Sequence, residues 1–144
     1  MRLAMLSLIA LLYAPFARAD PATEATLYKT PDCDCCEGYA DYLRTNGFQV
    51  TVVPTHNLTL MNREARVPEE LDGCHLTRVG GYMVQGHVPI TALKPLLTER
   101  PAINGISLPG MPEGSPGMSG RKRAPFTIYE IKDGEASAKV FAVE

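Results

Sequence analysis

Three of the four cysteines of this chain lie within four residues, at Cys33, Cys35 and Cys36, and the fourth, Cys74, lies far from them in the sequence. Four cysteines would ordinarily predict two disulfides in an oxidising compartment, but this spacing argues against a simple disulfide framework. One possible pairing closes a strained ring between neighbours, and another joins Cys33 to Cys35 in a very small loop. Cys33 with Cys36 and Cys35 with Cys74 is the most reasonable pairing. It remains an alternative to a metal site formed by all four thiols.

The cysteine cluster is predicted to lie on a turn between a strand and a helix. Residues 25–29 are typical of a short strand, and Thr30-Pro31-Asp32 turns the chain into the cluster. Residues 36–46 have apolar side chains at helical spacing and end on Asn46-Gly47, a stop signal. Residues 48–53 alternate apolar and polar side chains, as strands do. A β-α-β unit is therefore expected to open the fold.

The remaining residues predict further helices and strands. They are a helix at 57–66, a turn at 68–70, strands at 76–79 and 82–84 joined by Gly80-Gly81, a helix at 90–99, and strands at 126–131 and 136–143 joined by Asp133-Gly134. Pro95 is expected to fall in the first turn of its helix or to distort it. Residues 104–120, rich in glycine and proline, are expected to form a loop that carries Met111 and Met118. This order predicts an α/β fold, with a thioredoxin-like mixed sheet flanked by helices and an appended C-terminal β-hairpin at residues 125–143.

Residues 1–19 predict a Sec-type signal peptide. Arg2 precedes an apolar run, and Ala17-Arg18-Ala19 resembles a cleavage site. We therefore expect residues 20–144 to form one metal-binding domain in the periplasm, with no membrane span after cleavage; an uncleaved anchor is the alternative. The formal charge of the whole chain is −2, and the basic cluster at residues 121–123 is too short to predict binding to nucleic acid.

The predicted fold would bring the fourth cysteine to the other three. In a thioredoxin-like fold, the loop before the central hairpin faces the start of the first helix and usually carries a cis-proline. Gly73-Cys74-His75 occupies that place here, so a further sulfur would face the turn. Asp32, Asp34 and Glu37 are expected to oppose thiolate formation in the empty site and to favour a bound cation. Both features favour a soft metal, although a thiol–disulfide oxidoreductase of thioredoxin type remains an alternative.

A thiolate-rich site selects copper(I), zinc or an iron–sulfur cluster. Adjacent cysteines are poorly placed to join one zinc tetrahedron but suit several copper(I) ions, because each sulfur can bridge two metals. A zinc-stabilised binding module is the remaining alternative. The histidines differ: His87 is expected to bind or support the metal, His75 is a weaker candidate, and His56 is expected at the surface. The predicted metal ligands are Cys33, Cys35, Cys36, Cys74, His87 and the soft donors Met118 and Met111, with no separate catalytic residue.

Four short motifs follow one another in the chain. They are Cys33-Asp34-Cys35-Cys36, Cys74-His75, Gly86-His87-Val88-Pro89, and the Gly-Pro-Met segment at residues 109–118. Over residues 25–118 they resemble the CopG-like periplasmic copper-resistance family. The resemblance implies a thioredoxin-like protein that holds a multinuclear copper(I) cluster for copper resistance and homeostasis. It also implies interconversion of copper(I) and copper(II), and contact with other periplasmic copper-handling proteins. Asp34, where relatives commonly have glycine, and Leu76, where smaller residues are usual, depart from the family pattern.

Overall fold

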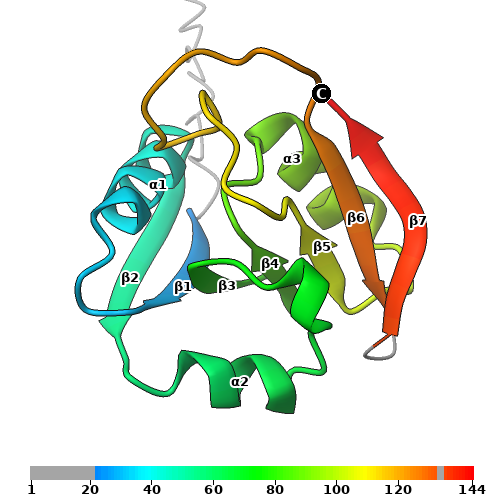
Figure 1. Cartoon of the computed structure of the whole chain (residues 1–144), viewed down its shortest axis with the longest axis horizontal. Coiled ribbons are helices and arrows are strands. Elements are labelled where there is room, and N and C mark those ends of the chain that lie inside the picture. Colours follow the sequence, from blue (N-terminus) through cyan, green and yellow to red (C-terminus); the bar gives the residue numbers. More distant parts are fainter. Residues whose placement is uncertain (1–21, 133–134) are drawn as a thin grey trace, which may run out of the picture.

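The computed structural model describes residues 22–132 and 135–144. The elements, in chain order, are β1 (Thr23–Lys29), α1 (Asp34–Thr45), β2 (Phe48–Pro54), α2 (Leu58–Glu64), the 3₁₀ turn η1 (Glu69–Leu71), β3 (His75–Val79), β4 (Tyr82–Gln85), α3 (Ile90–Glu99), β5 (Gly105–Ser107), β6 (Thr127–Lys132) and β7 (Glu135–Val143) (Figure 1). The predicted signal peptide at residues 1–19 and the predicted turn at Asp133-Gly134 lie outside the described residues.

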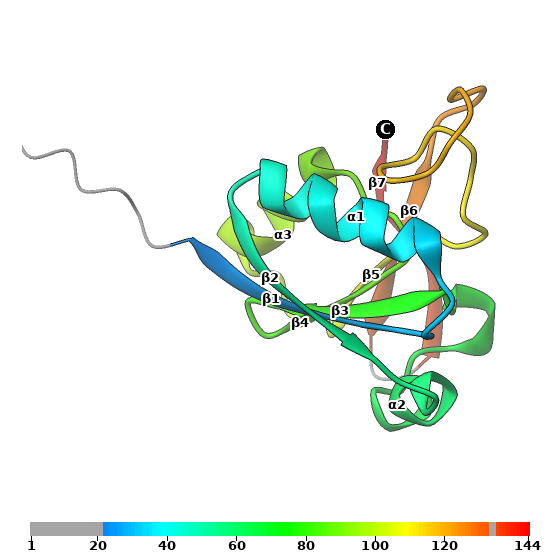
Figure 2. The ribbon, with the colours of Figure 1, turned by 90° about the vertical axis from the view of Figure 1, so that its left-hand side faces the viewer.

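A seven-stranded mixed sheet forms the centre of the molecule, in the order β2-β1-β3-β4-β5-β6-β7. β1 runs parallel to β2 and β4 parallel to β5, whereas the other neighbouring strands are antiparallel. Helices α1 and α3 lie on one face of β1–β4, and α2 lies on the other (Figure 2). The predicted α/β class, with a mixed sheet flanked by helices, is confirmed. The hairpin at Gly80-Gly81 is also confirmed, and both glycines have a positive φ.

Helix α1 begins at Asp34, two residues before the predicted start, so Cys33 is its N-cap and Cys35 and Cys36 lie in its first turn. Its buried residues recur at helical spacing and pack into the core between the helix and the sheet; they are Cys36, Tyr39, Ala40 and Leu43. Asp34 and Glu37 in the first turn and Arg44 in the last complement the helix dipole. The sulfur cluster is therefore anchored on one side by a helix that the core holds rigidly.

Of the two predictions made for Pro95 in helix α3, a place in the first turn is wrong. This proline lies in the interior of the helix rather than in its first turn, and the helix still runs from Ile90 to Glu99 as predicted. Proline lacks an amide hydrogen, so it removes one hydrogen bond to the carbonyl oxygen four residues earlier, on Thr91. Thr91 is exposed to solvent, where water can satisfy that oxygen. The burial of Ala92, Leu93 and Leu96 holds the helix on the sheet.

Strand β5 lies within the segment that was expected to be a loop. Gly105 begins it, and any Cβ atom there would collide with the carbonyl oxygen of Met83 in β4, so the close pairing of the two strands requires glycine. β5 pairs in turn with β6, and β6 with β7. The C-terminal strands therefore continue the central sheet. Within the described residues, no helix is long and apolar enough to cross a membrane.

Candidate metal centre

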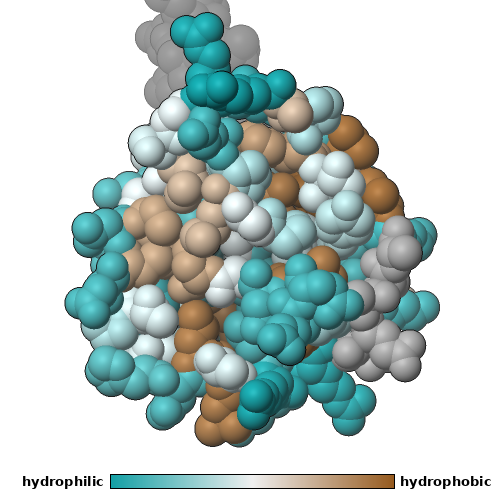
Figure 3. All heavy atoms as spheres, viewed as in Figure 1, coloured by the Kyte–Doolittle hydropathy of each residue, from teal (hydrophilic) through white to brown (hydrophobic). Residues whose placement is uncertain are grey.

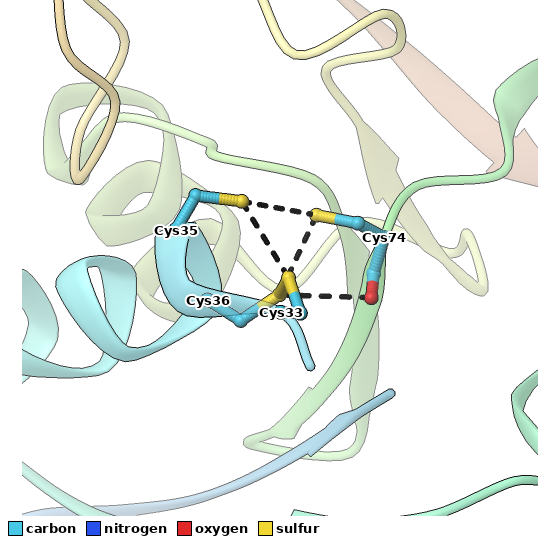
Figure 4. A group of neighbouring side chains, drawn as sticks. All are labelled: Cys33, Cys35, Cys36 and Cys74. Carbon is cyan, nitrogen blue, oxygen red and sulfur yellow. Dashed lines mark hydrogen bonds between the residues drawn. A yellow bond between two sulfur atoms is a disulfide. The ribbon is translucent and has the colours of Figure 1, made fainter. Parts of the chain in front are cut away.

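All four cysteines meet at the start of α1. Their Sγ atoms lie within 4.8 Å of one another and converge from α1 and from the segment before β3 (Figure 4). The Sγ of Cys35 lies 3.5 Å from that of Cys33 and 3.8 Å from that of Cys74. The Sγ atoms of Cys36 and Cys74 are 3.5 Å apart. The structure thus brings Cys74 to the turn, as predicted from the sequence.

The cysteines are present in two chemical states. Cys33 and Cys36 form a disulfide, whereas Cys35 and Cys74 are free thiols. Half of the disulfide pairing considered above is thus present, and the other two sulfurs face each other without a bond. Reduction of one disulfide would give four thiols close enough to share one ion or one cluster. Cys35 and Cys74 are partly exposed, so an incoming ion meets these two sulfurs first.

The register of β1 and β3 explains why Cys74 faces the turn. Lys29, the last residue of β1, pairs with His75, the first residue of β3, in antiparallel strands. The chain leaves Lys29 toward the cysteine turn and enters β3 through Cys74, so both segments lie at the same end of the sheet. The pairing of β1 with β3 therefore places the Cys74 sulfur beside the other three.

A buried polar network fixes the segment that carries Cys74. The Gly73 amide donates a hydrogen bond of 3.0 Å to Oε1 of Gln85, and Nε2 of Gln85 donates one of 2.8 Å to Oδ1 of Asn62. The Ser107 hydroxyl donates one of 2.8 Å to the carbonyl oxygen of Leu71. Gln85, Asn62 and Ser107 are all buried, which strengthens these bonds. Gln85 is not among the residues predicted from the sequence, because a glutamine at a strand end ordinarily predicts a solvated side chain.

Two histidines adjoin Cys74 and form with it a second group of possible ligands. Nδ1 of His75 lies 3.5 Å, and Nε2 of His87 3.7 Å, from the Cys74 sulfur. Nδ1 of His87 donates a hydrogen bond of 2.7 Å to the carbonyl oxygen of Pro116. The lone pair of the neutral His87 ring is therefore on Nε2, the atom that faces Cys74. Tyr39 packs against both rings, with centroids 4.8 and 5.4 Å away.

Burial controls the protonation of these groups. It raises the pKa of Cys74 to about 12, and the neighbouring Cys35 thiol adds to the effect. It lowers the pKa of His75 to about 3, with a further contribution from His87, and it lowers the pKa of His87. Both rings are thus neutral at neutral pH and can donate a lone pair, whereas Cys74 must lose its proton to bind a metal. Nearby acids were expected to oppose ionisation of the cysteines; at Cys74 the main cause is burial.

Lys29, also absent from the predicted site residues, has its side chain under the cysteine turn. It is only 4% exposed, and its Nζ donates hydrogen bonds to the carbonyl oxygens of Pro31 (3.0 Å) and Cys33 (3.2 Å). Oε1 of Glu37 lies 3.3 Å from the same Nζ. One of the three acids near the cluster is therefore paired with a cation. A lysine at the end of a strand ordinarily predicts a solvated charge, so no local pattern predicts this burial.

The glycine-rich loop ties Met118 to α1 but leaves Met111 exposed. A Cβ atom on Gly38 of α1 would lie 2.8 Å from the carbonyl oxygen of Gly117, so the two backbones are in direct contact. Met118 follows Gly117 and is half-buried, whereas Met111 is 42% exposed. His56 is exposed, as predicted. Both methionines remain predicted ligands.

The structure accommodates both departures from the family pattern. Asp34 has an ordinary helical backbone without positive φ, so the absence of glycine there causes no strain. Leu76 follows His75 in β3, and side chains alternate between the faces of a strand, so Leu76 faces away from the cysteines. Leu76 is fully buried.

On the molecular surface, apolar and intermediate side chains gather over α1, with hydrophilic ones around them (Figure 3).

The chain is similar to two solved structures of a copper resistance protein, CopG. Form 2 matches with a TM-score of 0.77 and 29% identity, over 85% of this chain and 98% of the other. Form 1 matches with a TM-score of 0.76 and 30% identity, over 84% of this chain and 96% of the other. A family model described as a protein of unknown function, DUF411, matches residues 71–118. No curated protein sequence matches the chain.

Proposed function

Because the chain belongs to the family of the copper resistance protein CopG, we propose that it is a periplasmic protein that holds several copper(I) ions for copper resistance and homeostasis. The observation that carries the proposal is the convergence of four sulfur atoms within 4.8 Å. In the reduced chain these are four soft donors, and soft thiolates favour copper(I). Copper is here the cargo of the protein. The proposed ligands are Cys33, Cys35, Cys36 and Cys74.

The histidines support a finer proposal, that the bound copper changes between copper(I) and copper(II). Cys74 belongs both to the four-sulfur group and to the group with His75 and His87. Imidazole nitrogen is a good ligand for copper(II), whereas thiolate favours copper(I). A site that combines both donors can hold either oxidation state. Reversible oxidation of the loaded protein that spares the cysteine thiols would support this proposal, and its absence would contradict it.

Anaerobic reconstitution tests the copper proposal. The reduced mature chain should bind more than one copper(I) per chain by elemental analysis, and Cys74→Ser should lose multinuclear binding, because Cys74 is the one cysteine outside the turn. His56→Ala is the matched control, since His56 is exposed and should leave the stoichiometry unchanged. A wild-type chain that binds at most one metal, or prefers zinc over copper(I), contradicts the proposal.

Export is proposed from the N-terminal sequence, with a basic start, an apolar run and an Ala-x-Ala site before Asp20. The mass of the protein recovered from a bacterial periplasm tests it. A mature chain that begins at Asp20 is the expected result. A chain that keeps residues 1–19 would contradict cleavage.

The Cys33–Cys36 disulfide at the start of a helix favours a second candidate, a thiol–disulfide oxidoreductase. Such an enzyme would use this pair alone, so Cys74→Ser should leave the reduction of a model disulfide largely intact. Under the copper proposal the same variant loses multinuclear binding. The two assays on one variant therefore separate the candidates.

A further inference from the structure

Lys29 places a buried positive charge directly under the cysteine turn. Its Nζ has four oxygen neighbours: the carbonyls of Thr30 (3.4 Å), Pro31 (3.0 Å) and Cys33 (3.2 Å), and Oε1 of Glu37 (3.3 Å). An ammonium group has three hydrogens to donate, so these oxygens satisfy all of them. Its hydrogen bonds hold the backbone between the end of β1 and the start of α1.

This position is unfavourable for a cation unless negative charge develops nearby. Burying an ammonium group carries a large desolvation penalty, and the N-terminus of a helix such as α1 has a partial positive charge that repels it. Glu37 compensates only in part, because its side chain is 52% exposed and solvent weakens the pair. The backbone hydrogen bonds could be made by a neutral donor. The charge itself therefore needs another explanation.

Reduction and copper loading supply the negative charge that would match it. Each thiolate carries one negative charge and each copper(I) one positive charge, so a four-thiolate site with fewer than four coppers is anionic. The Lys29 ammonium donates to the carbonyl of Cys33, on the turn side of that site. The backbone of Lys29 pairs in the sheet with that of His75, which follows Cys74.

We propose that Lys29 is a positioning residue of the metal centre, which holds the cysteine turn and stabilises the anionic, reduced cluster by its fixed charge. The inference rests on the proposed function, since it assigns the charge to a thiolate site that binds copper(I). It differs from the ligand assignment because Lys29 contacts the turn and does not bind copper.

The test compares Lys29→Met, Lys29→Gln and Lys29→Arg in the reduced mature chain. Competition with a chromophoric copper(I) chelator should show affinity weakened about tenfold or more in the Met and Gln variants, the order of effect seen when groups around a metal site are removed. Lys29→Arg keeps the charge and should stay within about threefold of wild type. The Gln variant keeps a donor, so it reports on charge even if the Met variant folds poorly. Circular dichroism and thermal unfolding verify the fold of each.

A metal-free measurement separates this inference from the copper proposal. On a Cys35→Ser, Cys74→Ser background, only the Cys33–Cys36 pair exchanges with a glutathione buffer. At about pH 9, where ordinary thiols are largely ionised, Lys29→Gln should shift the equilibrium about tenfold toward the disulfide, since the thiolates lose their counter-charge. Lys29→Arg should not. If wild type binds no copper cluster but this shift occurs, the copper proposal fails, and what stands is that the charge of Lys29 stabilises the reduced cysteine turn. Wild-type values for Lys29→Gln in both assays, or an Arg variant as impaired as Gln, would overturn the inference.

Discussion

Nδ1 of His87 lies 2.7 Å from the carbonyl oxygen of Pro116, and this contact decides which nitrogen of the ring can bind a metal. A carbonyl oxygen only accepts hydrogen bonds, so Nδ1 carries the proton and Nε2 the lone pair. Nε2 is the atom 3.7 Å from the Cys74 sulfur. The glycine-rich loop therefore orients the ring and presents its lone pair to the cysteines.

Replacing His87 should weaken copper binding without removing the four thiols. We expect His87→Ala to lower the copper(I) affinity by about 10–100-fold, as changes around metal ligands commonly do, with a larger effect on any copper(II) state because it loses an imidazole. Chelator competition measures the affinity, and the absorption spectrum of the oxidised protein reports on copper(II). His56→Ala, at an exposed position, should behave as wild type. Equal affinities in the two variants would exclude His87 from the site.

Two glycines with almost the same backbone angle test whether the loop must touch α1. Gly117 has φ +79° and Gly110 φ +80°, but a Cβ atom would collide with the Tyr39 amide nitrogen at Gly117 and meet nothing within 4 Å at Gly110. Both alanine variants should lose about 1–2 kcal/mol to the left-handed conformation. Gly117→Ala should lose at least about 1 kcal/mol more, because the loop must move away from the helix.

Chemical denaturation measures this difference in the free energy of unfolding. Copper titration supplies the second measurement. Only Gly117→Ala should weaken copper(I) binding, since the displaced segment includes Pro116, the hydrogen-bond partner of His87. Identical losses of stability in both variants would show that the contact with α1 carries no energy.

The sequence predicted the cysteine arrangement because its signals are local or follow from strand order. The spacing of Tyr39, Ala40 and Leu43 and the stop at Gly47 are properties of one helix, and its end was predicted within one residue. The position of Cys74 followed from the order of a β-α-β unit and a hairpin. The start of α1 was missed because Cys33, which caps it, makes no side-chain hydrogen bond of the kind that marks a helix start.

The supporting residues could not be predicted in this way. The partners of Gln85 are Gly73 and Asn62, 12 and 23 residues away, and no local pattern encodes such contacts. The burial of Lys29 could not be predicted, because it depends on carbonyl oxygens that the folded turn places around the ammonium group. Strand β5 was not predicted, because three residues in a glycine-rich segment are too few to show an alternating pattern.

Gln85 should matter for both stability and copper binding. Gln85→Leu leaves the Gly73 amide and Oδ1 of Asn62 without their partner inside the protein, so we expect a loss of about 1–3 kcal/mol in the free energy of unfolding. The same change at the exposed Gln49 of β2 is the matched control and should stay within about 0.5 kcal/mol of wild type. Copper(I) affinity should fall only in the Gln85 variant, because Cys74 follows Gly73. An unchanged affinity would mean that strand pairing alone positions Cys74.

The burial of the Tyr39 hydroxyl predicts that the protein loses stability at alkaline pH. Burial raises the pKa of Tyr39 well above its ordinary value, with Tyr42 adding to the effect, and its hydroxyl donates to the carbonyl oxygen of Val88. Above about pH 10 the unfolded chain releases this proton while the folded chain keeps it. The unfolded state then binds fewer protons, and the free energy of unfolding falls by up to about 1.4 kcal/mol per pH unit from this residue.

Tyr39→Phe removes the ionisable group and tests that sign. The variant should be less stable at neutral pH, because the carbonyl oxygen of Val88 loses its donor, but its stability should fall less steeply than that of wild type between about pH 10 and 12. Denaturant unfolding of the metal-free proteins measures how the free energy of unfolding changes with pH in wild type and in the variant. The other tyrosines contribute equally to both slopes. Parallel curves would contradict the protonated, buried state of Tyr39.

The disulfide between Cys33 and Cys36 predicts that oxidation of the turn and copper binding compete. Alkylation of the denatured oxidised chain without reductant should label two cysteines, Cys35 and Cys74, and reduction should raise the number to four. The oxidised chain keeps one thiol at the turn and one opposite it, 3.8 Å apart, so it should bind fewer copper(I) ions than the reduced chain.

Copper loading should in turn protect the turn from oxidation, because sulfurs bound to metal are not free to form the disulfide. The rate at which a mild disulfide oxidant converts the loaded and the metal-free chains provides the measurement. Cys35→Ser with Cys74→Ser is the control, since it keeps the disulfide pair but lacks the other two sulfurs, and copper should protect it far less. Equal copper stoichiometry before and after reduction of the wild type would show that Cys33 and Cys36 are not needed as ligands.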